Sequence, residues 1–413
     1  MKVLVSAYAC EPGKGSEAGE GWNWVTQISG PHQVWALTRA NNRGPIEKEL
    51  CDERLANIHW VYFDLPAWMR FWKKKQRGMR LYYYLWQVGA YLLARKLHRR
   101  IRFDLVHHLT FKSYWSPSML AFLATPFLWG PVGGGESAPH EFWRSFSIRG
   151  RVYEAARTLG RGWARFDPFV RFTARKATQA LATTDATQDR LRTLGCKNIS
   201  VFVLGLPSDD IHRLSAICPR EGSPFRIFSI GNLLHLKGFE LGLGAFAELQ
   251  RQFPASEYWL IGDGPERKRL DLLATQLGVR NKVRFYGALS RTQVLEQLAE
   301  CDVLLHPSLH DSAGWTCLEA MAAGRPVVCL DLGGPGLQVT KNTGIKVPAI
   351  SPAQVVHDLA AALSQLASDP ELRLQLGQAA RQRVVEHFNW DKKCELMMGI
   401  YKRVLETAGH PGV

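Results

Sequence analysis

Several features that mark particular protein classes are absent from this chain of 413 residues. Its eight cysteines are scattered without a CxxC pair, so they predict neither a zinc framework nor a disulfide scaffold and are typical of a reducing cytoplasm. No uninterrupted apolar run approaches the roughly 18–20 residues of a membrane-spanning helix. The composition therefore predicts a cytoplasmic protein that is soluble or peripheral to a membrane.

Acidic residues are absent from Leu65 to Phe103, although lysine, arginine and aromatic residues are frequent there, and the chain has a net charge of +15. A second basic and aromatic segment covers 142–176. Such charge predicts an anionic partner. Binding to an anionic membrane surface is the favoured interpretation, because aromatic rings suit the headgroup level. A core helix with a solvated basic face is the alternative, and nucleic acid is not predicted because no recognition motif accompanies the charge.

The familiar phosphate-binding fingerprints GxGxxG and GxxxxGK[ST] are also missing, as is a DxD-like metal motif, so no metal site is predicted. A weaker signal opens the chain, where a strand expected at 3–8 leads through a glycine-rich loop into a helix. Gly15 and Ser16 lie where such a loop presents backbone amides to a phosphate. An ordinary strand–loop–helix turn explains the same pattern.

Short apolar runs alternate with helical periodicity along both halves of the chain. We expect strands at 3–8, 34–38, 59–63, 104–109, 127–129, 180–184 and 199–204, and again at 225–230, 258–261, 283–286, 302–306 and 327–330. Such alternation with short connections predicts an α/β protein with doubly wound parallel sheets, which bind ligands at the carboxyl ends of their strands. A stretch at 215–224 with two prolines, glycine and serine predicts a linker between domains at 1–214 and 225–389.

One stretch, HPSLHDSAGWTCLEAMAAGRPVVCLDLGGP at 306–335, combines several of these signals. A polar loop with Asp311 leads into a helix that begins near Trp315 and carries Glu319. Backbone amides at a helix start hold anionic oxygens favourably, and two carboxylates flank this one. An N-cap aspartate and a solvated glutamate would be the plain alternative. A glycoside hydrolase pair is disfavoured by the parallel sheet and the phosphate loops.

Four segments in this order, IGNLLHLKG, LIGDGPE, VRFYGALS and the 306–335 stretch, resemble the retaining glycosyltransferases of family 4, which carry the group 1 domain. The resemblance is strongest over 225–336 and weaker for VHHLTF, WGPVGGGE and LATTDATQDRLRTLG. It implies the GT-B fold, in which two Rossmann-like domains face a cleft. The first domain then takes mainly the acceptor and the second the sugar nucleotide, and the final helix, within 390–413, crosses back to the first domain.

The resemblance also implies a donor site. Glu319 matches the acid that holds the ribose hydroxyls, and Asp311 matches the acid that contacts the donor sugar, where the family mostly has glutamate. Lys237 matches the lysine that neutralises the diphosphate, whereas Asn232 stands in place of an arginine. The other matched positions are Gly231 in the same loop as Asn232, the helix-start amides of Gly314, Trp315 and Thr316, the base-reading backbone of Gly287 and Ala288, and one of His107 and His108 near the donor sugar.

The activity implied is that of a metal-independent retaining hexosyltransferase without a cofactor. Its co-substrate would be a UDP- or GDP-sugar, and its acceptor a glycan or lipid-linked glycan of polysaccharide or cell-envelope biosynthesis, met at the inner face of the membrane. The charge missing at Asn232 would then come from another cation, such as His235 or an arginine of the first domain, or turnover would be slow. The alternatives are a GT-B sugar-nucleotide epimerase, a transferase with a soluble acceptor, and a non-catalytic nucleotide-sugar-binding protein.

Overall fold

The computed structural model describes residues 1–14, 16–49, 55–72, 78–218, 222 and 224–409. They form two compact units, which we call unit 1 (1–135, 159–202 and the chain from Cys394) and unit 2 (136–158 and 203–393). The predicted domain boundaries at 214, 225 and 389 stay predictions. Gly15 and parts of the predicted linker (219–221 and 223) and of the predicted basic segment (73–77) lie outside the described residues.

Unit 1 is built on a seven-stranded parallel sheet in the order β3-β2-β1-β4-β5-β6-β7. Its strands are β1 (Lys2–Ser6), β2 (Gln33–Arg39), β3 (Ile58–Phe63), β4 (Leu105–His108), β5 (Phe127–Val132), β6 (Gln179–Ala182) and β7 (Ile199–Val201). Successive residues of β1, Val3, Leu4 and Val5, are all fully buried. A strand reads as a continuous apolar run in this way when helices cover both faces of a parallel sheet.

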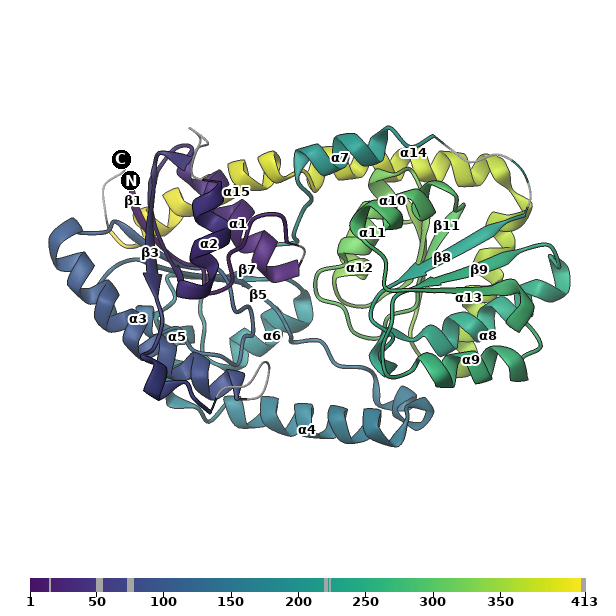
Figure 1. The fold of residues 1–413 in the computed structure, drawn as a ribbon, viewed down its shortest axis with the longest axis horizontal. Coiled ribbons are helices and arrows are strands. Elements are labelled where there is room, and N and C mark those ends of the chain that lie inside the picture. Colours follow the sequence, from purple (N-terminus) through teal and green to yellow (C-terminus); the bar gives the residue numbers. More distant parts are fainter. Residues whose placement is uncertain (15, 50–54, 73–77, 219–221, 223, 410–413) are drawn as a thin grey trace. The chain divides into compact units, whose positions relative to one another are not determined.

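Helices of unit 1 cover this sheet on two sides (Figure 1). They are α1 (Ser16–Ser29), α2 (Arg43–Lys48), α3 (Met79–Ile101), α5 (Pro168–Lys176) and α6 (Asp185–Thr193), together with most of α15 (Trp390–Thr407). The end of α4 (Ile148–Ala164) also belongs to this unit. Trp86 of α3 and Val170 of α5 share one core with the sheet residue Val106. On α15, Cys394 lies against Gln27 and Tyr401 against His107, so the last helix belongs to the first unit.

Unit 2 contains a six-stranded parallel sheet in the order β10-β9-β8-β11-β12-β13. Its strands are β8 (Arg226–Ile230), β9 (Glu257–Ile261), β10 (Val283–Gly287), β11 (Val303–His306), β12 (Val327–Leu330) and β13 (Gly344–Val347). The side chains of β9 alternate between two cores: Tyr258 and Leu260 lie in one, Trp259 and Ile261 in the other. The sequence predicted the first five of these strands, whereas β13 is a short strand that it did not predict.

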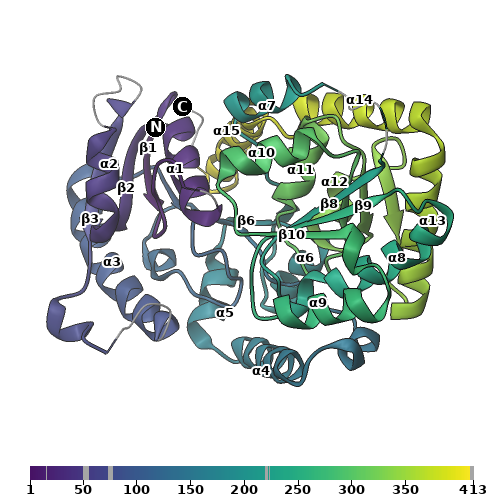
Figure 2. The ribbon, with the colours of Figure 1, turned by 45° about the vertical axis from the view of Figure 1, so that its right-hand side comes forward.

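Two layers of helices enclose the sheet of unit 2. The core that holds Tyr258 is completed by α8 (Phe239–Gln252), α9 (Arg267–Gln276) and α13 (Pro352–Ser368). The core on the opposite face of the sheet is completed by α7 (Ser208–Ser215), α10 (Arg291–Ala299), α11 (Trp315–Ala322) and α14 (Pro370–His387). The short helix α12 (Gly333–Gln338) follows β12. Figure 2 shows α8 and α9 on one side of the strands and α10 and α11 on the other. Phe142 and Phe146 of the segment 136–158 pack into the first core.

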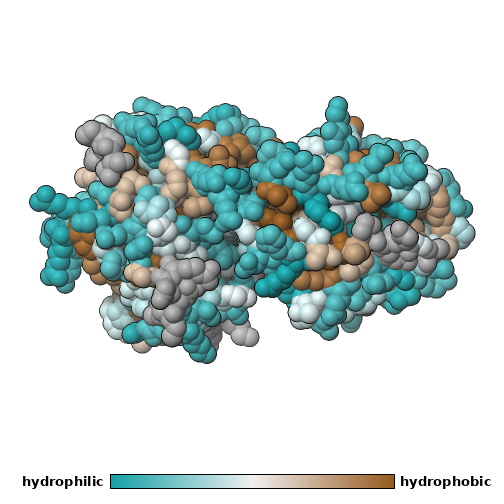
Figure 3. All heavy atoms as spheres, turned by 90° about the horizontal axis from the view of Figure 1, so that it is seen from above, coloured by the Kyte–Doolittle hydropathy of each residue, from teal (hydrophilic) through white to brown (hydrophobic). Residues whose placement is uncertain are grey.

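Both units therefore have Rossmann-like parallel sheets, and the predicted α/β fold class is confirmed. Hydrophobic side chains are mostly internal, and the face seen from above is largely hydrophilic, with separate small hydrophobic patches (Figure 3). Across the described ranges, every helix is too short or too polar to cross a membrane.

Candidate functional site

The candidate site lies at the carboxyl ends of β8 and β11, two neighbouring strands at the centre of the sheet of unit 2. After β8 the chain continues to β9 on one side, and after β11 it continues to β12 on the other. Such a reversal is the topological switch point at which open α/β sheets bind ligands. The loops 231–238 and 307–314 leave the sheet here, and they carry the predicted residues Lys237 and Asp311.

Lys237 and Asp311 meet directly, although 74 residues separate them. The Lys237 Nζ donates a hydrogen bond of 2.7 Å to Asp311 Oδ2, and the His306 Nε2 lies 3.2 Å from the same oxygen. Burial raises the pKa of the Asp311 carboxyl, but the His306 ring and the Lys237 ammonium together lower it by more. The net pKa therefore lies well below its usual range. Asp311 is therefore ionised, and it still exposes 16% of its side chain.

The start of α11 is fixed by the second oxygen of Asp311. Asp311 Oδ1 accepts hydrogen bonds from the amides of Ala313 (3.2 Å) and Gly314 (3.0 Å). Gly314 has φ of +58°, and a Cβ there would lie 2.3 Å from the Gln338 side chain, so only glycine fits. Trp315 then begins the helix, and its first turn is partly exposed. A helix N-terminus that is partly exposed in this way attracts anions, because its first backbone amides have no partner within the helix.

Glu319 lies one turn further along α11 and is 14% exposed. Arg291 of α10 donates to Glu319 Oε1 at 2.9 Å, and its other terminal nitrogen donates to Asp210 of α7 at the same distance. Burial raises the pKa of Glu319, and Arg291 offsets part of that rise. Arg291 was not predicted from the sequence, because its spacing does not connect α10 to α11 and only the packing of the two helices brings Arg291 to Glu319.

A second layer of polar residues holds the 307–314 loop from the side of the segment 136–158. An Nη atom of Arg157 lies 2.5 Å from His310 Nε2, and the Ser312 hydroxyl donates to Glu136 at 2.5 Å. Burial and the neighbouring Arg157 lower the pKa of His310. These contacts were not predicted from the sequence either, where their only signal is the glutamate that ends the WGPVGGGE segment.

The remaining predicted positions of unit 2 lie along the same edge of the sheet. Gly231 and the exposed Asn232 begin the loop that ends in Lys237. Gly287, with φ of +73°, ends β10, two strands from β8, and the exposed Ala288 follows. His235, a predicted substitute for the missing arginine, lies with its Nε2 3.2 Å from Glu154, which belongs to the same unit.

Three predicted positions lie in unit 1. His107 and His108 are fully buried on β4, and burial lowers their pKa values to about 4 and about 3. Both ring nitrogens of His107 are engaged, one 2.7 Å from the Tyr401 hydroxyl and one 2.6 Å from the Gly130 carbonyl oxygen. Their role near a donor sugar stays a prediction. Ser16 is the first residue of α1.

The arrangement in unit 2 brings together one partly exposed cation, one ionised carboxylate and a helix N-terminus. A ligand that carries phosphate oxygens beside hydroxyl groups would find a donor in Lys237 and an acceptor in Asp311. Among the residues that the structure describes, no group of three or more His, Cys, Asp or Glu side chains is placed to hold a metal ion.

Comparisons with known proteins agree on the family of this region. Residues 210–383 match the family model described as "Glycosyl transferases group 1". The 2-deoxystreptamine glucosyltransferase of Streptomyces kanamyceticus is 32% identical over 45% of this chain and 47% of its own length. A lipopolysaccharide core biosynthesis glycosyltransferase of Rhizobium meliloti, LpsD, is 28% identical over 52% of this chain and 60% of its own length. The chain spans about half the length of the curated relatives it matches first.

Similarity of fold extends over the whole chain. The crystal structure of Anabaena Alr3699/HepE in complex with UDP and glucose has a TM-score of 0.62 at 19% identity, covering 97% of this chain and 99% of that one. At this identity the similarity concerns the fold alone. Lys237, Asp311, Glu319 and Arg291 all lie inside the matched residues, whereas His107 and His108 lie outside them.

Proposed function

Because residues 210–383 match the family model of group 1 glycosyl transferases, we propose that this protein is a retaining glycosyltransferase of family 4 that moves a hexose from a nucleotide sugar to a glycan acceptor. The observation that carries the proposal is the contact between Lys237 and the ionised Asp311 at the start of α11. A cation, a hydroxyl acceptor and a helix N-terminus are the groups that a sugar diphosphate requires.

Each side chain takes a role that follows from its chemistry. Lys237 stabilises the negative charge that grows on the leaving diphosphate, and the amides at the start of α11 support it. Asp311 accepts hydrogen bonds from hydroxyls of the donor sugar and so positions it. Glu319 accepts from the ribose hydroxyls, with Arg291 holding its carboxylate in place.

The transfer exchanges one bond for another at the anomeric carbon. The bond from this carbon to the diphosphate oxygen breaks as the bond to the acceptor oxygen forms on the same face, and the acceptor proton passes to the diphosphate. The products are a nucleoside diphosphate and a glycoside of retained configuration. Asp311 is a positioning group in this scheme and forms no covalent bond. The scheme needs no metal, because Lys237 and the helix start carry the charge.

We take UDP-glucose as the first donor to test, with GDP-sugars as the alternative. This choice is supported by the Anabaena structure, whose complexes contain UDP, glucose and UDP-glucose. The proposed acceptor is a glycan or lipid-linked glycan of the cell envelope, supported by the similarity to a lipopolysaccharide core enzyme. The proposed place is the cytoplasmic face of the membrane, and the acid-free basic run at 65–103 supports it.

The experiment is a donor screen followed by an acceptor screen. A donor that binds the native state raises its melting temperature by mass action, so UDP, GDP and their sugars can be ranked by thermal shift. The best donor is then incubated with lipid and glycan extracts, and the nucleoside diphosphate and the anomeric configuration of the product are measured. Donor-dependent product in any extract supports the proposal.

A second candidate is a non-catalytic nucleotide-sugar-binding protein, which the uncharged Asn232 favours, because this position lacks the cation that the resemblance leads one to expect. Binding of a donor without release of its diphosphate in every extract would support that candidate. Release of a free epimer of the sugar without acceptor would instead indicate an epimerase. Both results overturn the proposed transfer.

A further inference from the structure

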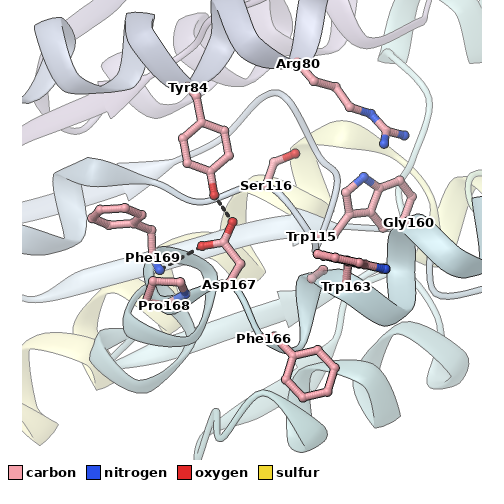
Figure 4. Close-up of a pocket in the computed structure, with 11 residues that line it drawn as sticks. Arg80, Tyr84, Trp115, Ser116, Gly160, Trp163, Phe166, Asp167, Pro168 and Phe169 are labelled. Carbon is pink, nitrogen blue, oxygen red and sulfur yellow. Dashed lines mark hydrogen bonds between the residues drawn. The ribbon is translucent and has the colours of Figure 1, made fainter.

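Unit 1 contains a pocket of about 560 Å³ that lies outside the group 1 domain. Arg80 and Tyr84 of α3 and Trp115 of the loop after β4 form part of its wall, and the end of α4 and the start of α5 form the rest (Figure 4). Arg80, Trp115 and Trp163 lie together on one side in this view, with Tyr84 and Asp167 on the other. Nothing in the proposed donor site uses this pocket.

The polar groups inside the pocket bind one another. The Tyr84 hydroxyl donates to the Asp167 carboxylate. The other oxygen of that carboxylate accepts from the amides of Phe169 (2.8 Å) and Val170 (3.1 Å), which makes Asp167 the N-cap of α5. Both oxygens of the carboxylate therefore accept hydrogen bonds from the protein itself, so the carboxylate is poorly placed to select the hydroxyls of a sugar. What the pocket offers to a ligand is mainly the faces of aromatic rings.

Large aromatic side chains surround the opening and are exposed to an unusual degree. Trp163 is 78% exposed, Phe166 71% and Phe169 43%. Phe122, itself 41% exposed, continues the surface: its ring centroid lies 6.4 Å from that of Phe169 and 4.0 Å from that of Phe172. Clustered apolar groups of this size on a surface mark a site that another apolar body covers.

Positive charge accompanies this aromatic surface. Arg80 lines the pocket, with its guanidinium 5.9 Å from the centroid of the Trp115 ring. Arg165 lies 5.4 Å from the ring of Phe166. Arg80 also belongs to the acid-free run at 65–103, which carries many basic residues. Apolar rings with a cation at their edge fit an amphiphile whose tail is a hydrocarbon and whose head is an anion.

We propose that this pocket binds the hydrocarbon chain of an anionic lipid, with Arg80 beside the phosphate of its headgroup. The lipid is either a phospholipid of the bilayer or the lipid carrier of the acceptor; both present the same chemistry. The proposal rests on the proposed function only for the second source. Because binding needs no nucleotide sugar, it can be measured separately from transfer.

The test fills the pocket without disturbing the fold. Gly160 lies on α4 in the pocket wall, and a Cβ there would approach only the end of the Arg80 side chain, at 3.7 Å. Gly162, two residues further on, has nothing within 4 Å of such a Cβ and does not line the pocket, so it is the matched control. Gly160→Gln and Gly162→Gln are compared with wild type by calorimetry, using monomeric dodecyl phosphate as the probe and inorganic phosphate and dodecyl maltoside as references.

We expect dodecyl phosphate to bind wild type at least tenfold more tightly than either reference, Gly160→Gln to weaken it tenfold or more, and Gly162→Gln to leave it unchanged. Equal binding of dodecyl maltoside, equal binding of inorganic phosphate, or no difference between the two glycine variants would each overturn the proposal. Sedimentation with phosphatidylglycerol vesicles separates the two sources. A loss of sedimentation in Gly160→Gln assigns a bilayer lipid, and unchanged sedimentation with weakened dodecyl phosphate binding assigns the acceptor carrier.

Discussion

The two Rossmann-like sheets have the same strand order around their switch points, but they place opposite chemistry there. In unit 2 the strand pair β8 and β11 delivers Lys237 and Asp311, both charged and both partly exposed. In unit 1 the equivalent pair is β1 and β4, and β4 ends in His107 and His108, which are fully buried and whose pKa values are strongly lowered. The topology brings side chains to one edge in each unit. Burial lowers the pKa values of the two histidines, whereas at Asp311 the neighbouring His306 and Lys237 outweigh burial and keep the carboxylate ionised.

Acidification should therefore affect the two units differently, and this is the largest effect that we expect. The pKa values of His107 and His108 are about 4 and about 3 when folded, against 6.5 as the ordinary value. Between pH 6.5 and these values the unfolded chain binds more protons, so stability is complete above pH 6.5 and is lost as pH falls. At pH 5 each histidine should cost on the order of 2 kcal/mol. In unit 2, the lowered pKa of His310 likewise makes the folded state less stable as the pH falls.

Hydrogen exchange at pH 7, 6 and 5, corrected for intrinsic rates, can follow each unit. We expect peptides of β4 to lose protection at higher pH than peptides of β11. His107→Gln is the control, because glutamine can hydrogen-bond to Tyr401 and Gly130 without titrating. In this variant, the number of protons that unit 1 takes up on unfolding should fall by one. Equal loss of protection in both units would contradict the comparison.

Removing the cation of unit 2 should be the most damaging change for activity. Lys237→Ala takes away the group that meets the diphosphate and leaves Asp311 without the partner of its 2.7 Å contact. Loss of one such electrostatic contact lowers kcat by about 10²–10³. Lys346→Ala is the matched control, because Lys346 also pairs with an aspartate at 2.8 Å, Asp331, but this aspartate is 51% exposed. Steady-state release of diphosphate measures both, and similar rates for the two variants would remove Lys237 from the mechanism.

Glu319 tests whether its contact with Arg291 serves the donor. Glu319→Gln keeps the shape of the side chain but removes its charge, and hydrogen bonds to charged groups contribute about 1.5–3 kcal/mol. We expect KM for the donor to rise roughly tenfold or more, with a smaller change in kcat. Glu300→Gln is the control, since Glu300 pairs with Arg226 at 2.7 Å yet is 60% exposed. A KM that moves equally in both variants would leave Glu319 a structural role only.

The sequence predicts the scaffold of the site better than its support. Alternating apolar runs placed β8 and β11, and the spacing of Asp311 and Glu319 placed α11, because strand and helix periods are local signals. Arg291, Arg157 and Glu136 escaped prediction because their partners lie 28, 153 and 176 residues away and meet them only in the folded chain. For His107 and His108, the sequence indicated a strand end, but it did not show that His107 lies against Tyr401 of α15, almost 300 residues later.

The smallest expected effect tests the position where the chain departs from the family resemblance. Asn232 is exposed, at the start of the loop that ends in Lys237. Asn232→Arg would add a second cation for the diphosphate, and we expect kcat/KM to rise about threefold to tenfold, since a charge-assisted contact exceeds a neutral one by roughly 1 kcal/mol. Asn281→Arg adds the same charge at another exposed position of unit 2 and is the control. If both variants gain equally, long-range attraction explains the change. If only Asn232→Arg gains, the uncharged position limits the rate in the natural chain, and unit 2 becomes still more strongly charged relative to the neutral edge of unit 1.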